Sequence, residues 1–486
     1  MKENLLKGVV KVTGKGVGYF PNPKDENNDF EIQPDNMHTA LTGDTVSVEV
    51  LAHEVYDRKQ AKVIEILERK KMDFVGELEV HGDGFFLVPD DKHMYRDIAV
   101  SKDKSKGANA GDKVQVKITS WLDEKKGPEG EVIRLIGRKG EHNAEMLSIV
   151  YEKGFEIDFP ADVETEARAW KAQFEGEDHL KNRKDFRGTT TFTIDPRDAK
   201  DFDDAISFKK LENNEYEIGI HIADVSHFVT PNTALDKEAI KRATSIYLVD
   251  RTIPMLPEIL SNDLCSLNAN EDKYAFSSVF VMNKNGEVKD KWFGRTLINS
   301  DRRFVYEDAQ EIMDKKEGMF VEELLTLNEI AKKLREEKAR AGAIEFETDE
   351  VKFVLDDKGK PIKVYKKSRT DVHKLIEEFM SLANREVAKY LSDAGLKNPK
   401  MAMVYRIHDA PSTEKIENLA NFVKALGFNL KNKKGETTGE DISDMLKSIE
   451  GSPSEALIKT ATIRSMQKAI YSTANIGHFG LAFKFY

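Results

Sequence analysis

The first 140 residues contain an internal repeat made of short apolar segments separated by glycine, asparagine, aspartate and proline. Residues 15–21 (KGVGYFP) match residues 82–89 (GDGFFLVP), and residues 43–50 (GDTVSVEV) match residues 111–118 (GDKVQVKI). Alternation of apolar and polar residues indicates half-buried strands, and the turn residues between them indicate tight connections. The repeat therefore predicts two similar, small all-β domains.

Each copy of the repeat carries aromatic residues beside a glycine in a predicted strand. This pattern resembles the surface on which cold-shock domains of the OB-fold type stack nucleic-acid bases. We therefore predict one cold-shock barrel at residues 5–70 and a second at residues 72–140. Because neighbouring strand residues face opposite sides, the alternative is that one aromatic residue of each pair lies inside its barrel. The predicted RNA-stacking residues are Tyr19, Phe20, Phe85 and Phe86.

The composition excludes several other classes of protein. A chain of 486 residues is longer than a single hydrophobic core usually supports, which predicts several domains. No apolar run approaches the roughly 18 residues of a membrane span, and the first residues lack the apolar segment of a signal peptide. Cys265 is the single cysteine, so an internal disulfide is excluded and a buried thiol in a cytoplasmic protein is expected. The net charge of −11 argues against a protein that coats polyanions, so any nucleic-acid contact is expected to be local.

From about residue 141 the pattern changes to longer helical periods mixed with apolar strands, which predicts a mixed α+β domain at residues 145–486. The predicted strands cover residues 189–194, 216–222 and 275–283. The predicted helices cover residues 143–153, 163–174, 233–245, 320–339, 371–393, 412–425 and 454–472. Basic patches at residues 360–367 and 431–434 are expected to be solvated surface rather than RNA contacts.

Residues 193–205 read TIDPRDAKDFDDA, with five aspartates directly after an apolar strand. Carboxylates held a few ångströms apart repel one another, whereas a hard divalent cation turns the same geometry into a stable site. Asp195 leaves the strand before a proline, and Asp201, Asp203 and Asp204 return after a short loop. The sequence therefore predicts a Mg²⁺ site, which Mn²⁺ also suits, able to polarise a phosphate and activate water.

Two other interpretations apply to this acidic segment. An EF-hand calcium loop does not fit, because neither the aspartate spacing nor the required glycine is present. A solvated acidic turn without a metal ion is the alternative to the predicted metal site. Asp198 is expected to be structural or solvated. His221 and His227 flank Asp224, and we expect them to be hydrogen-bonded scaffolding rather than metal ligands.

Longer stretches resemble the catalytic domain of the RNase II and RNase R family of exoribonucleases. The matching motifs are DPRDAKDFDDA (195–205), IHIADVSHF (220–228), DLCSLN (263–268), EFETDEVK (345–352), HKLIEEFMSLAN (373–384) and VYRIHDAP (404–411). The repeat ahead of them is similar to the family's two cold-shock domains. The resemblance implies a monomer that processively hydrolyses RNA from a single-stranded 3′ end to 5′-nucleoside monophosphates, with Mg²⁺ and without a nucleotide cofactor.

The resemblance also implies roles for individual residues. Asp195, Asp201 and Asp204 match the family's metal-binding carboxylates, and Asp203 matches the aspartate assigned to the cleavage step. The further residues that match RNA-binding positions are Tyr247 and Phe346, which would clamp the terminal bases, and Glu377 with Tyr306, which would contact the ribose. A 2′-hydroxyl contact at Glu377 would distinguish RNA from DNA.

The sequence departs from the family at its end. It stops at Tyr486, where the family continues into a serine-proline-isoleucine-arginine-arginine motif and a further OB-fold domain. We therefore expect a truncated protein with impaired activity, since one arginine of that motif supplies charge to the reacting phosphate. The alternative function is a non-catalytic RNA-binding protein. A metal phosphoesterase acting on small molecules is disfavoured, because paired barrels suit a polymer.

Overall fold

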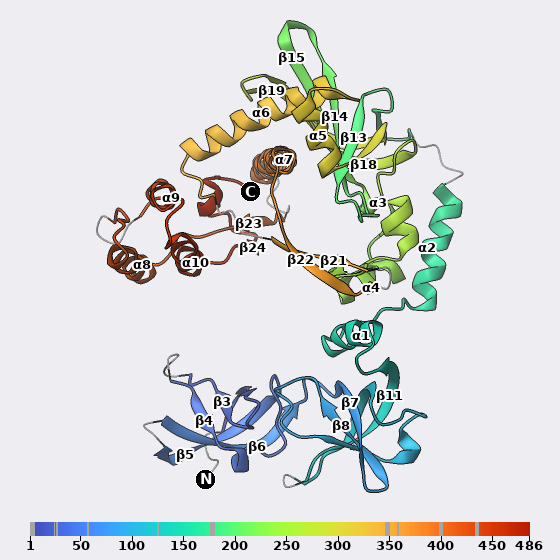
Figure 1. Cartoon of the computed structure of the whole chain (residues 1–486), viewed down its shortest axis with the longest axis vertical. Helices are drawn as coiled ribbons and strands as arrows, with labels where there is room; N and C mark the ends of the chain where they lie inside the picture. Colours follow the sequence, from blue (N-terminus) through green and yellow to red (C-terminus); the bar gives the residue numbers. More distant parts are fainter. Residues whose placement is uncertain are drawn as a thin grey trace. The chain divides into compact units, whose positions relative to one another are not determined.

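The computed structural model describes residues 5–23, 25, 28–55, 58–123, 126–174, 180–345, 350–356, 359–397, 402–432 and 437–486 (Figure 1). The chain forms two compact units, which are described separately. The first comprises residues 1–159 with Tyr247–Ile253 and Leu355–Ile362, and the second comprises the rest. No helix among the described residues is long and apolar enough to cross a membrane.

The first six strands form one sheet with the order β1-β5-β6-β4-β3-β2. Their bounds are β1 Leu6–Val9, β2 Lys11–Val12, β3 Gly18–Phe20, β4 Phe30–Ile32, β5 Thr45–Val55 and β6 Arg58–Glu68. Alternate residues of these strands, among them Val46, Val48 and Val63, fill a core of their own. The period of two in the sequence thus builds a separate small β-domain.

The next five strands close into a barrel with the order β10-β11-β9-β8-β7. Their bounds are β7 Asp73–His81, β8 Gly84–Pro89, β9 Ile98–Val100, β10 Asp112–Ser120 and β11 Glu129–Arg138. Gly76 of β7 pairs with Pro89 of β8. A Cβ atom at position 76 would come within 2.1 Å of the Val88 carbonyl oxygen, so only glycine fits. Helix α1 (His142–Glu152) follows and packs on β7, β10 and β11.

A seven-stranded sheet organises the second unit, in the order β12-β19-β18-β15-β14-β13-β20. Its strands are β12 Lys184–Asp185, β13 Thr191–Asp195, β14 Asp204–Lys210, β15 Glu215–Ala223, β18 Asp272–Asn283, β19 Val288–Asn299 and β20 Arg302–Val305. The pairs β13·β20 and β12·β19 are parallel, whereas the other neighbours are antiparallel. One face packs on helices α5 (Tyr306–Lys315), α6 (Val321–Arg340) and α7 (Asp371–Lys397) to form the largest core.

Further helices and strands lie outside these sheets and the helices already described. They are α2 Ala161–Phe174, α3 Val225–Phe228, α4 Ala234–Arg242, β16 Ile246–Tyr247, β17 Thr252–Ile253, the π-helix η4 Ile259–Leu264, β21 Glu350–Leu355 and β22 Pro361–Lys367. The chain closes with β23 Tyr405–Ile407, α8 Thr413–Ala425, α9 Gly439–Ser448, α10 Glu455–Ser465 and β24 Ile470–Ser472. Helices α8, α9 and α10 share a separate apolar core.

The predicted fold class is confirmed, because two small β-domains precede a mixed α+β domain. The predicted helix at 454–472 is wrong over its last part. Helix α10 ends at Ser465, and Ile470–Ser472 instead pairs with β23 as strand β24. A tertiary pairing thus overrides the local helical period. Helix α9 was not predicted, although Thr438 and Asp441 form a capping box at its start.

Candidate active site

Two neighbouring strands of the seven-stranded sheet present the predicted aspartates at one edge. Asp195 is the last residue of β13, and Asp204 is the first residue of β14. The two strands pair antiparallel through Thr191–Ser207 and Phe192–Ile206, so the end of one lies beside the start of the other. The loop between them carries Asp201 and Asp203 back to the same edge.

Hydrogen bonds to the backbone of this loop hold it in place. The Ser266 hydroxyl accepts from the Phe202 N–H at 3.0 Å and donates to the Lys200 carbonyl at 3.0 Å. The Phe202 carbonyl accepts from the Leu267 N–H, and the Asp203 carbonyl accepts from the Ala223 N–H, both at 2.9 Å. The backbone around Asp203 is therefore fixed from two sides.

Arg303 of β20 fixes the other end of the loop. Its Nη2 donates to the carbonyls of Pro196 and Arg197 at 2.7 and 2.9 Å, and its guanidinium lies 5.1 Å from the centre of the Phe202 ring. These hydrogen bonds engage backbone oxygens and not carboxylates. Arg303 therefore orders the loop, while its charge offsets only part of the repulsion felt by Asp195.

The aspartates form an electrostatically strained cluster. Asp195 is 8% exposed; burial raises its pKa to about 7, and the charges of Asp204 and Asp203 add to that shift. Burial raises the pKa of Asp204 to about 6, and Asp203 contributes again. Asp203 keeps part of its surface open to solvent, yet the surrounding protein and the nearby Asp201 raise its pKa too. Such a cluster favours a bound cation over bare carboxylates.

The donor set fits a hard divalent cation, although the side chains are not gathered around one point. Within the described residues, no three His, Cys, Asp or Glu side chains form a ready metal-binding group. Oδ2 of Asp195 is buried and lacks a hydrogen-bond partner among these residues. A buried carboxylate oxygen without a donor is costly, so it marks a position where a cation would be stabilising.

Tyr306 lies beside the aspartates. It begins α5 directly after β20, whose parallel pairing with β13 sets Val305 opposite Asp195. Burial raises the pKa of Tyr306 to about 12, with further contributions from Asp204 and Asp195. The ring stacks on His373, with centroids 3.9 Å apart and planes inclined by 7°. The phenol therefore stays protonated at neutral pH and can act as a donor.

Glu377 lies one turn after His373 on α7, so the two side chains share a face of the helix. Its carboxylate pairs with Arg369, and 44% of its side chain is exposed. The structure thus brings Glu377 near the stacked Tyr306 and His373. A ribose contact by Glu377 and Tyr306 stays a prediction.

The structure describes one of the two predicted base-clamping residues. Tyr247 lies in the β16–β17 hairpin and is 69% exposed. Phe346 lies outside the described residues. The clamp therefore stays a prediction.

The prediction that Phe20 stacks on RNA is wrong. Phe20 is 1% exposed and packs in the core of the first β-domain, because it points to the opposite side of β3 from Tyr19. Tyr19 is partly exposed, and the Arg58 guanidinium lies 5.8 Å from its ring centre. In the second barrel Phe85 packs against the core, whereas Phe86 faces outward beside His81.

His221 and His227, which we did not expect to bind metal, belong to the scaffold. His221 is fully buried, and its ring nitrogens lie 2.6 Å from the Ser277 hydroxyl and 2.8 Å from the Ser207 hydroxyl. Burial lowers its pKa to about 3, so the ring is neutral. His227 packs edge-on against Phe228 and Tyr274. Hydrogen-bonded scaffolding is confirmed for His221, and His227 contributes ring contacts.

Sequence reasoning did not single out three residues that organise this region: Ser266, Arg303 and His373. Ser266 and His373 lie inside motifs quoted for the family resemblance. The spacing of four between His373 and Glu377 in a predicted helix was a signal that they share a face. Arg303 gave no sequence signal, because its contacts depend on the pairing of β20 with β13.

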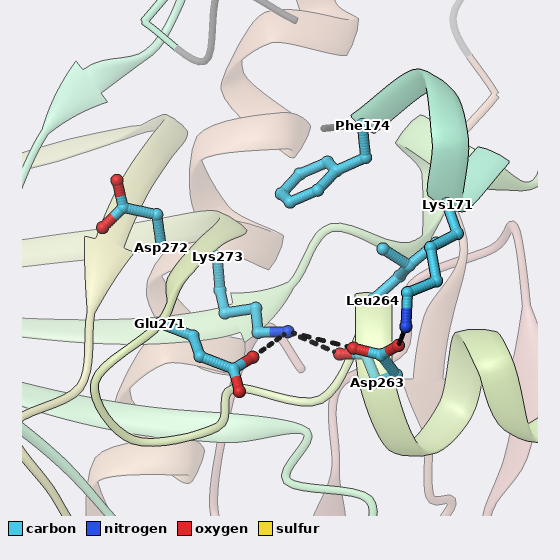
Figure 2. Close-up of a pocket in the computed structure, with 7 residues that line it drawn as sticks. All are labelled: Lys171, Phe174, Asp263, Leu264, Glu271, Asp272 and Lys273. Carbon is cyan, nitrogen blue, oxygen red and sulfur yellow. Dashed lines mark hydrogen bonds and ion pairs between the residues drawn. The ribbon is translucent and has the colours of Figure 1, made fainter. Parts of the chain in front are cut away.

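A cavity of about 380 Å³ opens at the end of α2 (Figure 2). Lys171 lies 2.7 Å from Asp263, and Lys273 lies 2.8 Å from Glu271, as the dashed contacts in Figure 2 show. Each lysine is already paired with a carboxylate. The cavity therefore does not offer free positive charge to a phosphate.

Comparisons with known families match almost the whole chain. Residues 183–486 match the RNB domain family, residues 86–160 match the cold shock domain family, and residues 8–66 match the ribonuclease B OB domain family. Ribonuclease R of Thermotoga maritima is 35% identical over 99% of this chain and 68% of the relative. Ribonuclease R of Escherichia coli is 32% identical over 99% of this chain and 59% of the relative.

Solved structures agree with these matches. Ribonuclease R of Mycoplasma genitalium, in complex with ribose methylated single-stranded RNA, superposes with a TM-score of 0.90 at 25% identity over 99% of this chain and 76% of that chain. Yeast Ssd1, a pseudonuclease, has the same fold with a TM-score of 0.65 at 17% identity, over 99% of this chain and 66% of that chain. Given the domain order, the RNB match over more than half of its length and these relatives, the chain belongs to the ribonuclease R family of RNB-domain exoribonucleases.

Proposed function

We propose that this chain hydrolyses single-stranded RNA processively from its 3′ end, releasing 5′-nucleoside monophosphates with the help of Mg²⁺. Asp195, Asp201 and Asp204 would hold the ion, and Asp203 would act in the cleavage step. The observation that carries this proposal is the buried Oδ2 of Asp195, which has no hydrogen-bond partner in the described part of the chain and lies in a cluster of carboxylates whose pKa values are raised.

The chain's own residues have distinct tasks in this proposal. A divalent ion bound by the aspartates would polarise the scissile phosphate and activate water for attack. Asp203 is open to solvent on a backbone held by Ala223, and its raised pKa suits it to accept a proton from the attacking water. Protonated Tyr306 would donate a hydrogen bond to the substrate beside the aspartates.

Selection of RNA over DNA is proposed to depend on the ribose. A carboxylate at Glu377 can accept a hydrogen bond from a 2′-hydroxyl, which DNA lacks. The contact of Glu377 with Arg369 would orient that carboxylate. Stacking of terminal bases on Tyr247 would add affinity without sequence preference.

The test uses 5′-labelled single-stranded RNA and a DNA of the same sequence, with Mg²⁺ and with EDTA. We expect a ladder that shortens from the 3′ end on RNA alone and stops with EDTA. Asp203→Asn should keep RNA affinity while the cleavage rate falls by about 10²- to 10⁴-fold. Asp198→Asn is the matched control, because Asp198 is an exposed aspartate of the same loop.

The outcomes separate this proposal from the alternative of RNA binding without cleavage. Equal degradation of DNA, internal cuts or full activity of Asp203→Asn would contradict the proposal. RNA binding with no Mg²⁺-dependent cleavage would support the alternative. The fold of the catalytic domain does not decide between them, because a pseudonuclease shares it. The four retained aspartates favour cleavage, since a binding surface gains nothing from mutually repelling carboxylates.

A further inference from the structure

Strands β21 and β22 form a two-stranded sheet, and neither pairs with a further strand among the residues that the structure describes (Figure 1). Large apolar side chains are exposed along both strands, including Val351 at 56%, Phe353 at 41%, Val364 at 59% and Tyr365 at 45%. An isolated hairpin is only marginally stable in water, and contiguous exposed apolar side chains mark interaction sites. The hairpin therefore has the character of a surface that a partner covers.

The strand register gathers several of these residues on one side. The Asp356 N–H donates to the Lys360 carbonyl at 2.9 Å, which makes these two residues opposite one another. Counting back along the antiparallel strands from this pair sets Phe353 opposite Lys363, and the next pair on that face is Val351 with Tyr365. We call the side formed by Val351, Phe353, Lys363 and Tyr365 the hairpin face.

Charge identifies the class of partner. Residues 360–369 contain five basic residues and no acidic residue, in a chain whose net charge is −11. Lys363 is exposed, and the register sets it opposite Phe353 and two residues before Tyr365 on the same side of β22. Exposed aromatic rings interleaved with basic side chains are the arrangement that binds single-stranded nucleic acid. An ordinary solvated basic strand would not also expose apolar side chains on both faces.

We propose that the hairpin face is a binding site for single-stranded RNA, in which a base stacks on Tyr365 and Lys363 contacts a phosphate. This inference rests on the proposed function, because it names a second contact for the same RNA outside the aspartate cluster. It differs from the expectation that the basic patch at residues 360–367 is solvated surface, and the experiment below decides between the two.

The experiment measures binding of a fluorescein-labelled unstructured RNA by anisotropy, with EDTA so that the RNA is not cut. Tyr365→Ala should weaken binding by about 5- to 150-fold, whereas Tyr365→Phe should bind like the parent chain. Lys363→Ala should lower the slope of log K against log salt by about 0.7 in magnitude, the value for one phosphate contact on a single strand. Lys363→Arg should keep the slope.

Two matched controls come from other exposed positions. Tyr390→Ala removes an exposed tyrosine from α7, and Lys237→Ala removes an exposed lysine from α4; neither should change affinity or slope. Thermal melting of every variant checks that the fold is intact. A folding defect would weaken binding in Tyr365→Phe as well, or shift the melting temperature.

The failures of the two proposals differ. If the parent chain binds no RNA, the proposed function fails. If the parent chain binds and the hairpin variants show unchanged affinity and salt slope, only the hairpin inference is overturned. Self-association of the parent chain that Tyr365→Ala abolishes, with RNA affinity unchanged, would also overturn it, because the surface would then bind a second copy of this chain.

Discussion

The buried ion pair between Arg183 and Asp224 offers the sharpest test of how the scaffold supports the site. Arg183 Nη2 lies 2.8 Å from Asp224 Oδ2, and the two side chains are 4% and 1% exposed. The guanidinium also lies 3.8 Å from the ring centre of Tyr274. Asp224 directly follows Ala223, whose N–H binds the Asp203 carbonyl. The ion pair therefore supports the backbone that carries Asp203.

The expected loss of stability in Arg183→Met arises from the buried Asp224 carboxylate, which loses its closest cation. Removing one partner of a buried pair usually costs about 3–5 kcal/mol, because the remaining charge stays desolvated. Asp224 would keep the Ser226 hydroxyl at 2.7 Å and the half-exposed Arg295 at 3.4 Å. Because these partners remain, we expect the free energy of unfolding to fall by about 3 kcal/mol, near the lower end of that range. Cleavage should fall by about 10- to 100-fold if the loop shifts by ångströms.

Urea unfolding followed by tryptophan fluorescence gives the free energy of unfolding for each variant. Arg183→Met/Asp224→Asn should be more stable than Arg183→Met alone, because the double variant leaves no buried charge. Arg187→Met is the matched control; its pairs with Asp185 and Asp272 are exposed, so about 0–1 kcal/mol is expected. A loss below about 1 kcal/mol for Arg183→Met, or a double variant less stable than the single one, would refute the reasoning.

Two further predictions concern cation binding and pH. Mg²⁺ added after EDTA treatment should raise the melting temperature of the parent chain and leave Asp195→Asn unchanged; an equal rise in both would contradict a site at Asp195. The pKa of His221 is lowered from 6.5 to about 3. Between these pH values the unfolded chain therefore binds a proton at His221 that the folded chain does not bind. The free energy of unfolding should therefore fall as pH drops below 6.5, by up to about 1.4 kcal/mol per pH unit from this group, and His221→Gln should reduce that slope in matched urea titrations.

Much of the fold and of the site could be predicted because the signals are local. The apolar run before Asp195 predicted that this aspartate lies at the end of a strand, as it does in β13, whereas strand β14, which begins at Asp204, was not predicted. The turn residues of the repeat likewise predicted two β-domains. Phe20 could not be assigned in the same way, because a period of two fixes which residues share a face and not which face is buried.

Other features depend on contacts between distant segments. The end of α10 depends on the pairing of Ile470–Ser472 with β23, and the role of Arg303 depends on carbonyls of a loop that lies far away in sequence. A sequence shows the charge of Arg303 but not its hydrogen-bond acceptors. Its position near four aspartates would suggest a counter-ion, whereas the structure assigns its hydrogen bonds to the backbone.

The hydrogen-bond acceptors of Arg303 determine how much negative charge the aspartates keep. If Arg303 neutralised the carboxylates, the cluster would be a satisfied ion-pair network and could be purely structural. Arg303 instead donates to the carbonyls of Pro196 and Arg197, so its charge offsets only part of the repulsion around Asp195, and burial keeps the pKa of that carboxyl raised to about 7. The same hydrogen bonds hold the loop that returns Asp203 and Asp204 to the strand edge. Arg303 thus fixes the loop through backbone oxygens, and the carboxylates keep negative charge that the proposed divalent ion would bind.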